Sequence, residues 1–118
     1  MVKEITQNLI DDFDGQLVSF SDSIEIFRRS PYGYRIMLEI MAGHFGVQQE
    51  KITLEHLSKK VARLASRITV NNLLKLLKEK GLITIQKDSQ DQRLKVIRPS
   101  DKLVTDYHNW VNLVFKNV

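Results

Sequence analysis

The apolar residues of one central stretch repeat at helical spacing. Between 66 and 80 they recur every third or fourth residue, at Val70, Leu73, Leu74 and Leu77. Ser66 precedes this pattern and can cap a helix, because its hydroxyl can accept a hydrogen bond from an amide of the first turn. Gly81 follows it, where a left-handed residue would end a helix. The pattern therefore predicts a helix with one apolar face over residues 66–80.

Shorter apolar patterns flank this helix. Before it, residues 54–62 form a short amphipathic segment for which Thr53 is a plausible N-cap. After it, apolar runs at 82–85 and 94–97 predict two strands joined by a polar turn, and Ile52 with Thr53 could add a short third strand. Helix, turn, helix and hairpin in this order predict a winged helix-turn-helix fold, whose second helix enters the major groove of DNA.

Helical spacing also marks both ends of the chain. Apolar positions in residues 3–29 are separated mostly by three and four, with an interruption at Asp14 and Gly15 that could end a first helix or merely weaken a long one. A last helix is expected over about 100–116. These stripes offer more apolar surface than a small winged domain needs, so packing within one chain and a dimer seam are both open.

One more helix is expected between the first stripe and the central stretch. Proline at position 31 disfavours helix at Ser30, so residues 30–33 are expected to form a loop. The helix is then expected over 34–45, with Gly46 at its end. The prediction for the 118 residues is one mainly α (α+β) winged-helix domain. Its parts are an N-terminal helical region (1–30), a winged helix-turn-helix core (34–100) and a C-terminal helix (101–118), with the terminal helices serving dimerisation.

Positive charge is concentrated in the central stretch. The net charge is +4, but residues 1–58 hold 5 Lys/Arg against 9 Asp/Glu, whereas residues 59–98 hold 11 against 3. The basic block coincides with the second helix of the pair and the hairpin, where contacts with phosphates would need it. A solvated lysine-rich helix would have a similar composition, but the agreement of charge with fold pattern favours nucleic acid as the partner.

The composition argues against several other classes of protein. The chain has no cysteine, which excludes disulfides, thiolate metal sites and thiol redox sensors. No apolar run approaches the roughly 20 residues of a transmembrane helix, and the N-terminus does not resemble a signal peptide, so a cytoplasmic protein is expected. His44, His56 and His108 lack metal-ligand spacing, and no nucleotide-binding or nucleophile motif occurs. We therefore expect no enzyme, no metal and no cofactor.

Four short motifs follow one another through the central stretch. They are Ser66-x-x-Thr69-Val70, Leu77-x-x-Lys80-Gly81-Leu82-Ile83, Asp88-x-x-Asp91-x-Arg93 and Arg98-Pro99-Ser100. In this order they resemble the MarR family of regulators over roughly residues 34–100. Pro99 and Ser100 stand where that family usually has Leu-Thr, and the last helical region, 101–118, is shorter than is usual there. The resemblance implies a winged-helix transcriptional regulator in which Asp91 holds Arg93 at the wing.

The polar face of helix 66–80 carries side chains suited to reading DNA bases. Arginine can read guanine and asparagine can read adenine through paired hydrogen bonds in the major groove. Arg67, Asn71 and Asn72 are therefore the candidates for base contacts; the alternative for each asparagine is an ordinary exposed helix position, and it weighs more for Asn72 than for Asn71. Thr69 and Lys75 are better suited to phosphates.

Further candidates lie before and after this helix. The first helix of the pair crosses the phosphate backbone in this fold, and the wing (86–95) can place a guanidinium in the minor groove. The predicted DNA-binding residues are Lys59, Lys60, Arg63, Ser66, Arg67, Thr69, Asn71, Asn72, Lys75, Lys87, Arg93 and Lys95.

These patterns predict a sequence-specific, double-stranded DNA-binding transcriptional regulator that acts as a homodimer. The expected dimer contacts are Leu9, Phe13, Leu17, Phe20, Tyr107, Trp110 and Val114. A winged-helix replication or partition factor and a protein-interaction module are the alternatives. Nothing in the sequence identifies a small-molecule effector.

Overall fold

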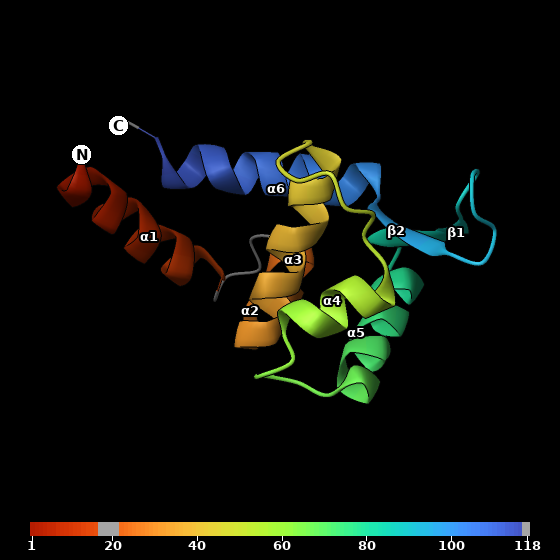
Figure 1. The fold of residues 1–118 in the computed structure, drawn as a ribbon. Coiled ribbons are helices and arrows are strands. Elements are labelled where there is room, and N and C mark those ends of the chain that lie inside the picture. The colour runs from red at the N-terminus through yellow and green to blue at the C-terminus, as the bar shows by residue number, and fades with distance from the viewer. Residues whose placement is uncertain (17–21, 117–118) are drawn as a thin grey trace.

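The computed structural model describes residues 1–16 and 22–116, which form helices and one β-hairpin (Figure 1). In chain order the elements are α1 (Val2–Gln16), α2 (Asp22–Arg28), α3 (Pro31–His44), α4 (Leu54–Lys60), α5 (Arg67–Glu79), β1 (Ile83–Lys87), β2 (Lys95–Pro99) and α6 (Asp101–Val114). Helix, turn, helix and hairpin appear at α4, α5, β1 and β2, which confirms the predicted winged helix-turn-helix.

Four of the helices begin with a hydroxyl cap. The N-cap side chains of Ser30, Thr53, Ser66 and Ser100 accept hydrogen bonds from the amides of Gly33, His56, Thr69 and Leu103. The caps at Thr53 and Ser66 were predicted, but the loop predicted over 30–33 is wrong. Pro31 occupies the first turn of α3, where its fixed φ suits a helix and its missing N–H costs nothing. The restriction that proline imposes acts on Ser30, which as the N-cap is already extended.

A tight cap joins the second helix of the pair to the hairpin. Gly81 has φ 71°, its amide donates to Lys78 O at 3.0 Å, and the next amide, of Leu82, donates to Leu77 O at 2.9 Å. This pair of bonds is a Schellman motif, and it turns the chain from α5 into β1 over the three residues 80–82. The Leu82 carbonyl in turn accepts a hydrogen bond from the amide of Ser100, the cap of α6, at 2.9 Å.

The hairpin is a two-stranded antiparallel sheet among the described residues, in the register Ile83 to Pro99 and Lys87 to Lys95. The expected third strand is not formed. Ile52 contributes one backbone hydrogen bond, in which its carbonyl accepts from the Ile97 amide at 2.8 Å. The next residue, Thr53, already caps α4, so the chain turns away before a strand can extend.

The core lies where α3 passes between α6 and the α4–α5 pair (Figure 1). Its fully buried side chains come from all of these helices and from α2: Phe27, Ile24, Ile36, Met37, Ile40, Met41, Leu57, Leu74, Leu77, Leu103, Val61 and Val70. Val70, Leu74 and Leu77 are the predicted apolar face of α5. Burying this face fixes which side of α5 is left for solvent.

Helix α1 packs on α6 through polar contacts. Asn8 Nδ2 donates to Val114 O at 2.9 Å and to Lys116 O at 2.6 Å, so it binds carbonyls at the C-terminal end of α6. Asp12 accepts a hydrogen bond from Trp110 Nε1 at 2.9 Å. The helix continues through Gly15 and ends at Gln16, so the expected interruption coincides with its last turn.

The predicted dimer residues fall into three groups. Leu9 and Phe13 of α1 are exposed. Tyr107 and Trp110 are half-buried and Val114 is buried, so α6 uses these three at least partly within its own chain. Leu17 and Phe20 lie outside the described residues. Within the described part of the chain, no helix is long and apolar enough to cross a membrane.

Candidate nucleic-acid interface

The face of α5 opposite the core is polar and open. Arg67, Asn72 and Lys75 are exposed and Asn71 is half-exposed, whereas Val70 is buried on the other side. The structure therefore brings the three predicted base-reading side chains together on one helix, with Lys75 beside them. Ile68 is also exposed on this helix, at 74%.

Arg67 is held by a carboxylate that the sequence did not reveal. Its guanidinium forms an ion pair with Glu55 from the first turn of α4, and both side chains remain more than half exposed. Acidic residues are common in the first turn of any helix, because they favour its positive end. Glu55 therefore looked ordinary in the sequence, and only the crossing of α4 with α5 gives it a partner.

Ser66 and Thr69 have structural contacts at the start of α5. Ser66 Oγ accepts from the Thr69 amide at 3.2 Å and lies 3.1 Å from Thr69 Oγ1. Ser66 is exposed and Thr69 is half-exposed, so both hydroxyls remain at the surface. Before them, Lys59, Lys60 and Arg63 are exposed along the end of α4 and the turn that follows. The predicted phosphate-contacting residues thus border the open face of α5.

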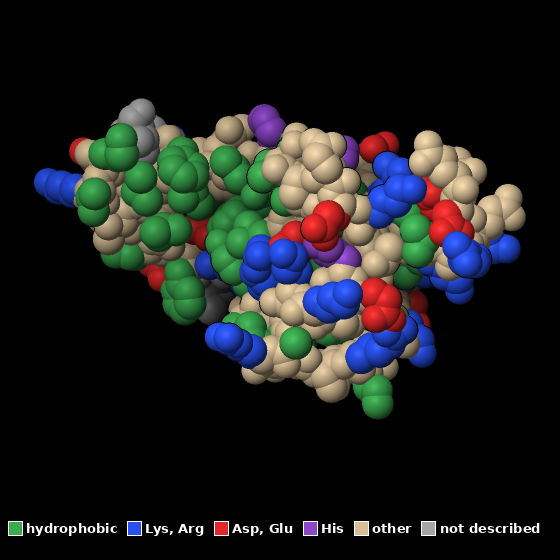
Figure 2. Space-filling model, in the orientation of Figure 1, with side chains coloured by type: hydrophobic (Ala, Val, Ile, Leu, Met, Phe, Trp, Pro, Cys, Tyr) green, Lys and Arg blue, Asp and Glu red, His purple; other side chains and the backbone are tan. Residues whose placement is uncertain are grey.

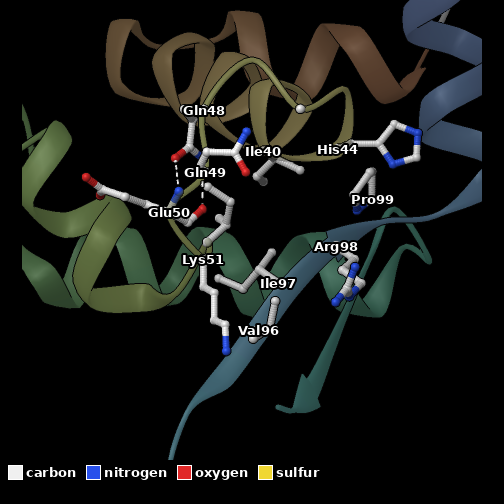
Figure 3. Close-up of a pocket in the computed structure, with 13 residues that line it drawn as sticks. Ile40, His44, Gln48, Gln49, Glu50, Lys51, Val96, Ile97, Arg98 and Pro99 are labelled. Atoms are coloured by element: carbon white, nitrogen blue, oxygen red, sulfur yellow. Dashed lines mark hydrogen bonds between the residues drawn. The ribbon is translucent and has the colours of Figure 1, made fainter. Parts of the chain in front are cut away.

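The wing turn is built around Asp88. Its Oδ2 accepts hydrogen bonds from the amides of Gln90 and Asp91, at 3.1 and 2.9 Å, and from Lys51 Nζ at 2.7 Å. The Lys51 ammonium, followed by these amides, lowers the pKa of Asp88 below its usual value. Figure 3 shows the Lys51 side chain extending from the connector before α4 alongside Ile97 and β2. Lys51 was missed by sequence reasoning, because it is 37 residues from its partner.

Arg93 projects from the wing with 92% of its side chain exposed. Its Nε and a terminal nitrogen donate to the two carboxylate oxygens of Asp91, at 3.1 and 3.3 Å. This hydrogen bond from Arg93 is the largest cause of a lowered pKa at Asp91. The contact between Asp91 and Arg93 that the family resemblance implied is therefore present, and it fixes the direction of the exposed guanidinium.

Two lysines oppose one another across the hairpin. Lys87 and Lys95 are paired in the register of β1 and β2, and both are exposed. Like charges directly opposite in a sheet are destabilising, and an anion between them would relieve the repulsion. Figure 2 shows Lys and Arg side chains gathered over the lower part of the molecule, where α4 and α5 lie, and again over the hairpin at the right.

A hollow of about 260 Å³ lies between the end of α3, the connector 46–53 and β2 (Figure 3). Its lining includes His44, Glu50, Lys51 and Arg98. Gln48 is tied to the connector by two hydrogen bonds with the Glu50 backbone. Across the described ranges, no three His, Asp or Glu side chains gather in a way that could hold a metal ion.

Comparisons with known proteins yield similar folds but no similar sequence family. No protein-family model matches the chain, and no curated protein matches it. A complex of S. aureus MepR with DNA aligns with a TM-score of 0.61 and 23% identity, over 89% of this chain and 78% of that one. The transcriptional repressor CouR, bound to a 23-mer DNA duplex, aligns at 0.57 and 17%, over 87% and 69%.

YusO from Bacillus subtilis also aligns, with a TM-score of 0.56 and 12% identity, over 96% of this chain and 74% of that one. These structures are MarR-family winged-helix regulators. The resemblance seen in the sequence motifs is therefore confirmed at the level of fold.

Proposed function

We propose that this chain, which has the fold of the MarR-family regulators, is a sequence-specific double-stranded DNA-binding protein that regulates transcription. The observation that carries the proposal is the polar face of α5. It presents Arg67, Asn71 and Asn72 beside cations of the preceding turn, and the wing adds further cations (Figure 2). A buried apolar side opposite this face leaves α5 free to enter a major groove.

Each predicted residue has a part in this arrangement. Arg67, Asn71 and Asn72 contact bases, because their side chains have the paired donors and acceptors that base edges require. Phosphates are contacted by the residues around the turn and along α5, namely Lys59, Lys60, Arg63, Ser66, Thr69 and Lys75. The wing places Lys87, Arg93 and Lys95 at the minor groove.

Two similar structures support the DNA partner by analogy of fold. MepR and CouR were each solved bound to DNA. Fold analogy alone does not establish function, so the weight of the proposal rests on the side chains of α5 and the wing.

We further propose that the protein acts as a homodimer. Leu9, Ile10 and Phe13 leave an apolar surface on α1, and the left part of Figure 2 shows hydrophobic side chains gathered where α1 and α6 lie. A two-fold axis there would present two recognition helices to successive major grooves, about 34 Å apart. Sedimentation equilibrium at micromolar concentration tests this assembly, and a monomer throughout would contradict it.

Salt dependence of duplex binding tests the proposed function. If about six phosphates are neutralised in the complex, affinity falls about a thousandfold between 50 and 200 mM salt. Lys60→Ala should weaken binding to all duplexes alike. Lys3→Ala is the matched control, because it removes an exposed lysine of α1. Affinity that stays flat across this salt range would count against DNA and in favour of a protein-interaction module.

A further inference from the structure

A second hollow, of about 390 Å³, lies beside the turn between α4 and α5. It is lined by Arg35 of α3 and by residues 59–64, and we refer to it as the turn hollow. We propose that the turn hollow binds a phosphate group and that Arg35, which no sequence motif singled out, is one of its ligands. The inference rests on the proposed function where the phosphate belongs to DNA.

The turn hollow has a strong excess of positive charge. Arg35, Lys59, Lys60 and Arg63 line it. Among the described residues, only Arg35 of these four has an ion pair, with Glu39. The carbonyls at the C-terminal end of α4 would disfavour an anion, so binding depends on these cationic side chains.

Arg35 is positioned by a buried carboxylate. One of its terminal nitrogens lies 2.7 Å from Glu39 Oε1, and the Glu39 side chain is only 6% exposed. The other oxygen of Glu39 faces His56 Nε2 at 3.3 Å, so α3 and α4 share this carboxylate. Glu39 thus fixes the guanidinium from the inner side, while 45% of the Arg35 side chain stays open to solvent.

The cationic side chains of the turn hollow suit a phosphate group. A guanidinium has five donors in a planar fork, and one contact to Glu39 leaves donors for two oxygens of a phosphate. Lysine ammonium groups add charge without demanding one geometry. The apolar part of the lining comes from Val61, Ala62 and Leu64, of which Val61 is buried and Leu64 is exposed.

The position of the turn hollow points to the DNA backbone as the source of that phosphate. The lining ends at Leu64, three residues before Arg67, the first residue of α5. A duplex whose bases face α5 would therefore pass its backbone close to the turn hollow. A free phosphate monoester has the same chemistry, and the test below separates the two sources.

Salt-dependent duplex binding of Arg35→Gln, compared with the natural chain, is the first experiment. One phosphate contact contributes about 0.9 to the slope of log affinity against log salt, which corresponds to about 3.5-fold between 50 and 200 mM. Arg35→Gln should reduce the salt effect by that factor for each protomer bound. Arg35→Lys should restore the slope, because it returns the charge.

Arg29→Gln is the matched control. Arg29 is an exposed arginine that also pairs with a glutamate four positions away, Glu25, but it does not line the turn hollow. Its substitution should leave the slope unchanged. An unchanged slope in Arg35→Gln, or an equal reduction in Arg29→Gln, would overturn the inference. Melting temperatures of all variants establish that each one is folded.

Inorganic phosphate separates this inference from the proposed function. If the natural chain binds no duplex at any salt concentration, the proposed function fails, and amide NMR shifts are followed on addition of inorganic phosphate at constant ionic strength. Shifts confined to residues 59–64 and to Arg35, and lost in Arg35→Gln, would support a site for a free phosphate monoester. Absence of such shifts would then reject the turn hollow as a phosphate site.

Discussion

The buried carboxylate of Asp12 in α1 contacts side chains of α2 and α6, and removing one of these partners should lower the stability of the fold by a predictable amount. Asp12 is 1% exposed, and its Oδ2 accepts hydrogen bonds from Trp110 Nε1 at 2.9 Å and from Arg28. Its Oδ1 has no partner among the described residues. Trp110→Phe removes the indole donor and leaves the buried carboxylate with Arg28 alone. We expect this substitution to lower the free energy of unfolding.

The structure allows the size of this effect to be estimated. A hydrogen bond to a charged group is worth about 1.5–3 kcal/mol. Trp110 is half-buried, so the lost ring volume adds less than the roughly 3–5 kcal/mol of a Trp→Ala substitution in a core. The total is about 2–4 kcal/mol, which lowers the melting temperature by roughly 6–20 °C for a domain of this size.

Denaturant unfolding at a fixed protomer concentration measures the effect, because a dimer would make stability depend on concentration. Tyr107→Phe is the matched control. Tyr107 is half-buried on the same helix, and its hydroxyl forms no hydrogen bond with the described residues. Its loss should change stability by less than about 0.5 kcal/mol.

A double-mutant cycle separates the hydrogen bond from the change in ring size. Asp12→Ala removes the acceptor, and Trp110→Phe should then cost less than it does in the natural chain. The coupling should lie within about 0.5–3 kcal/mol. The reasoning is refuted if Trp110→Phe costs no more than the tyrosine control, or if the two substitutions are additive.

Three further predictions concern the interface. Arg67→Ala and Asn71→Ala should each cost about 1–3 kcal/mol on the preferred site and relax sequence preference, measured by competition between duplexes; wild-type discrimination in both would contradict their assignment to bases. Arg93→Ala should weaken DNA binding at an unchanged melting temperature, and unchanged affinity would make Arg93 an ordinary surface side chain. Because the folded pKa of Asp88 is lowered, its contribution to wing stability is present above the ordinary value of 3.8 and is lost as pH falls through the folded value. The protection factor of the Gln90 amide, which corrects for the intrinsic pH dependence of exchange, should therefore fall in acid; a protection factor that stays constant through this protonation would argue against the turn geometry.

Local rules account for the parts of the fold that could be predicted. The caps at Thr53 and Ser66 and the left-handed Gly81 each depend on a few neighbouring residues, so the sequence contains the information directly. The wrong prediction of a loop over residues 31–33 also concerns a local rule. Proline restricts the residue before it, Ser30, but it does not restrict the first turn of α3 that follows.

Contacts between distant segments could not be predicted in the same way. Glu55 with Arg67 and Lys51 with Asp88 join residues that only the crossing of elements brings together. Charge type gave no signal, because exposed acids and lysines occur throughout the chain. The sequence therefore predicted the cations and amides of the candidate interface, but it did not predict that Glu55 pairs with Arg67 or that Asp88 pairs with Lys51.

Leu82 has a mechanical consequence for the whole domain. Its amide donates to Leu77 O at the end of α5, and its carbonyl accepts from the amide of Ser100, the N-cap of α6. Strand β1 begins at the next residue. Helix α5 and the hairpin, which we propose contact the major and the minor groove, are thus both joined to α6 through Leu82. A tilt of α6 would therefore rotate α5 and the hairpin together as one rigid body, without changing the conformation of either. In the proposed dimer, regulation acting on α6 would then change the distance between the two α5 helices and leave the bases contacted within each half-site unchanged.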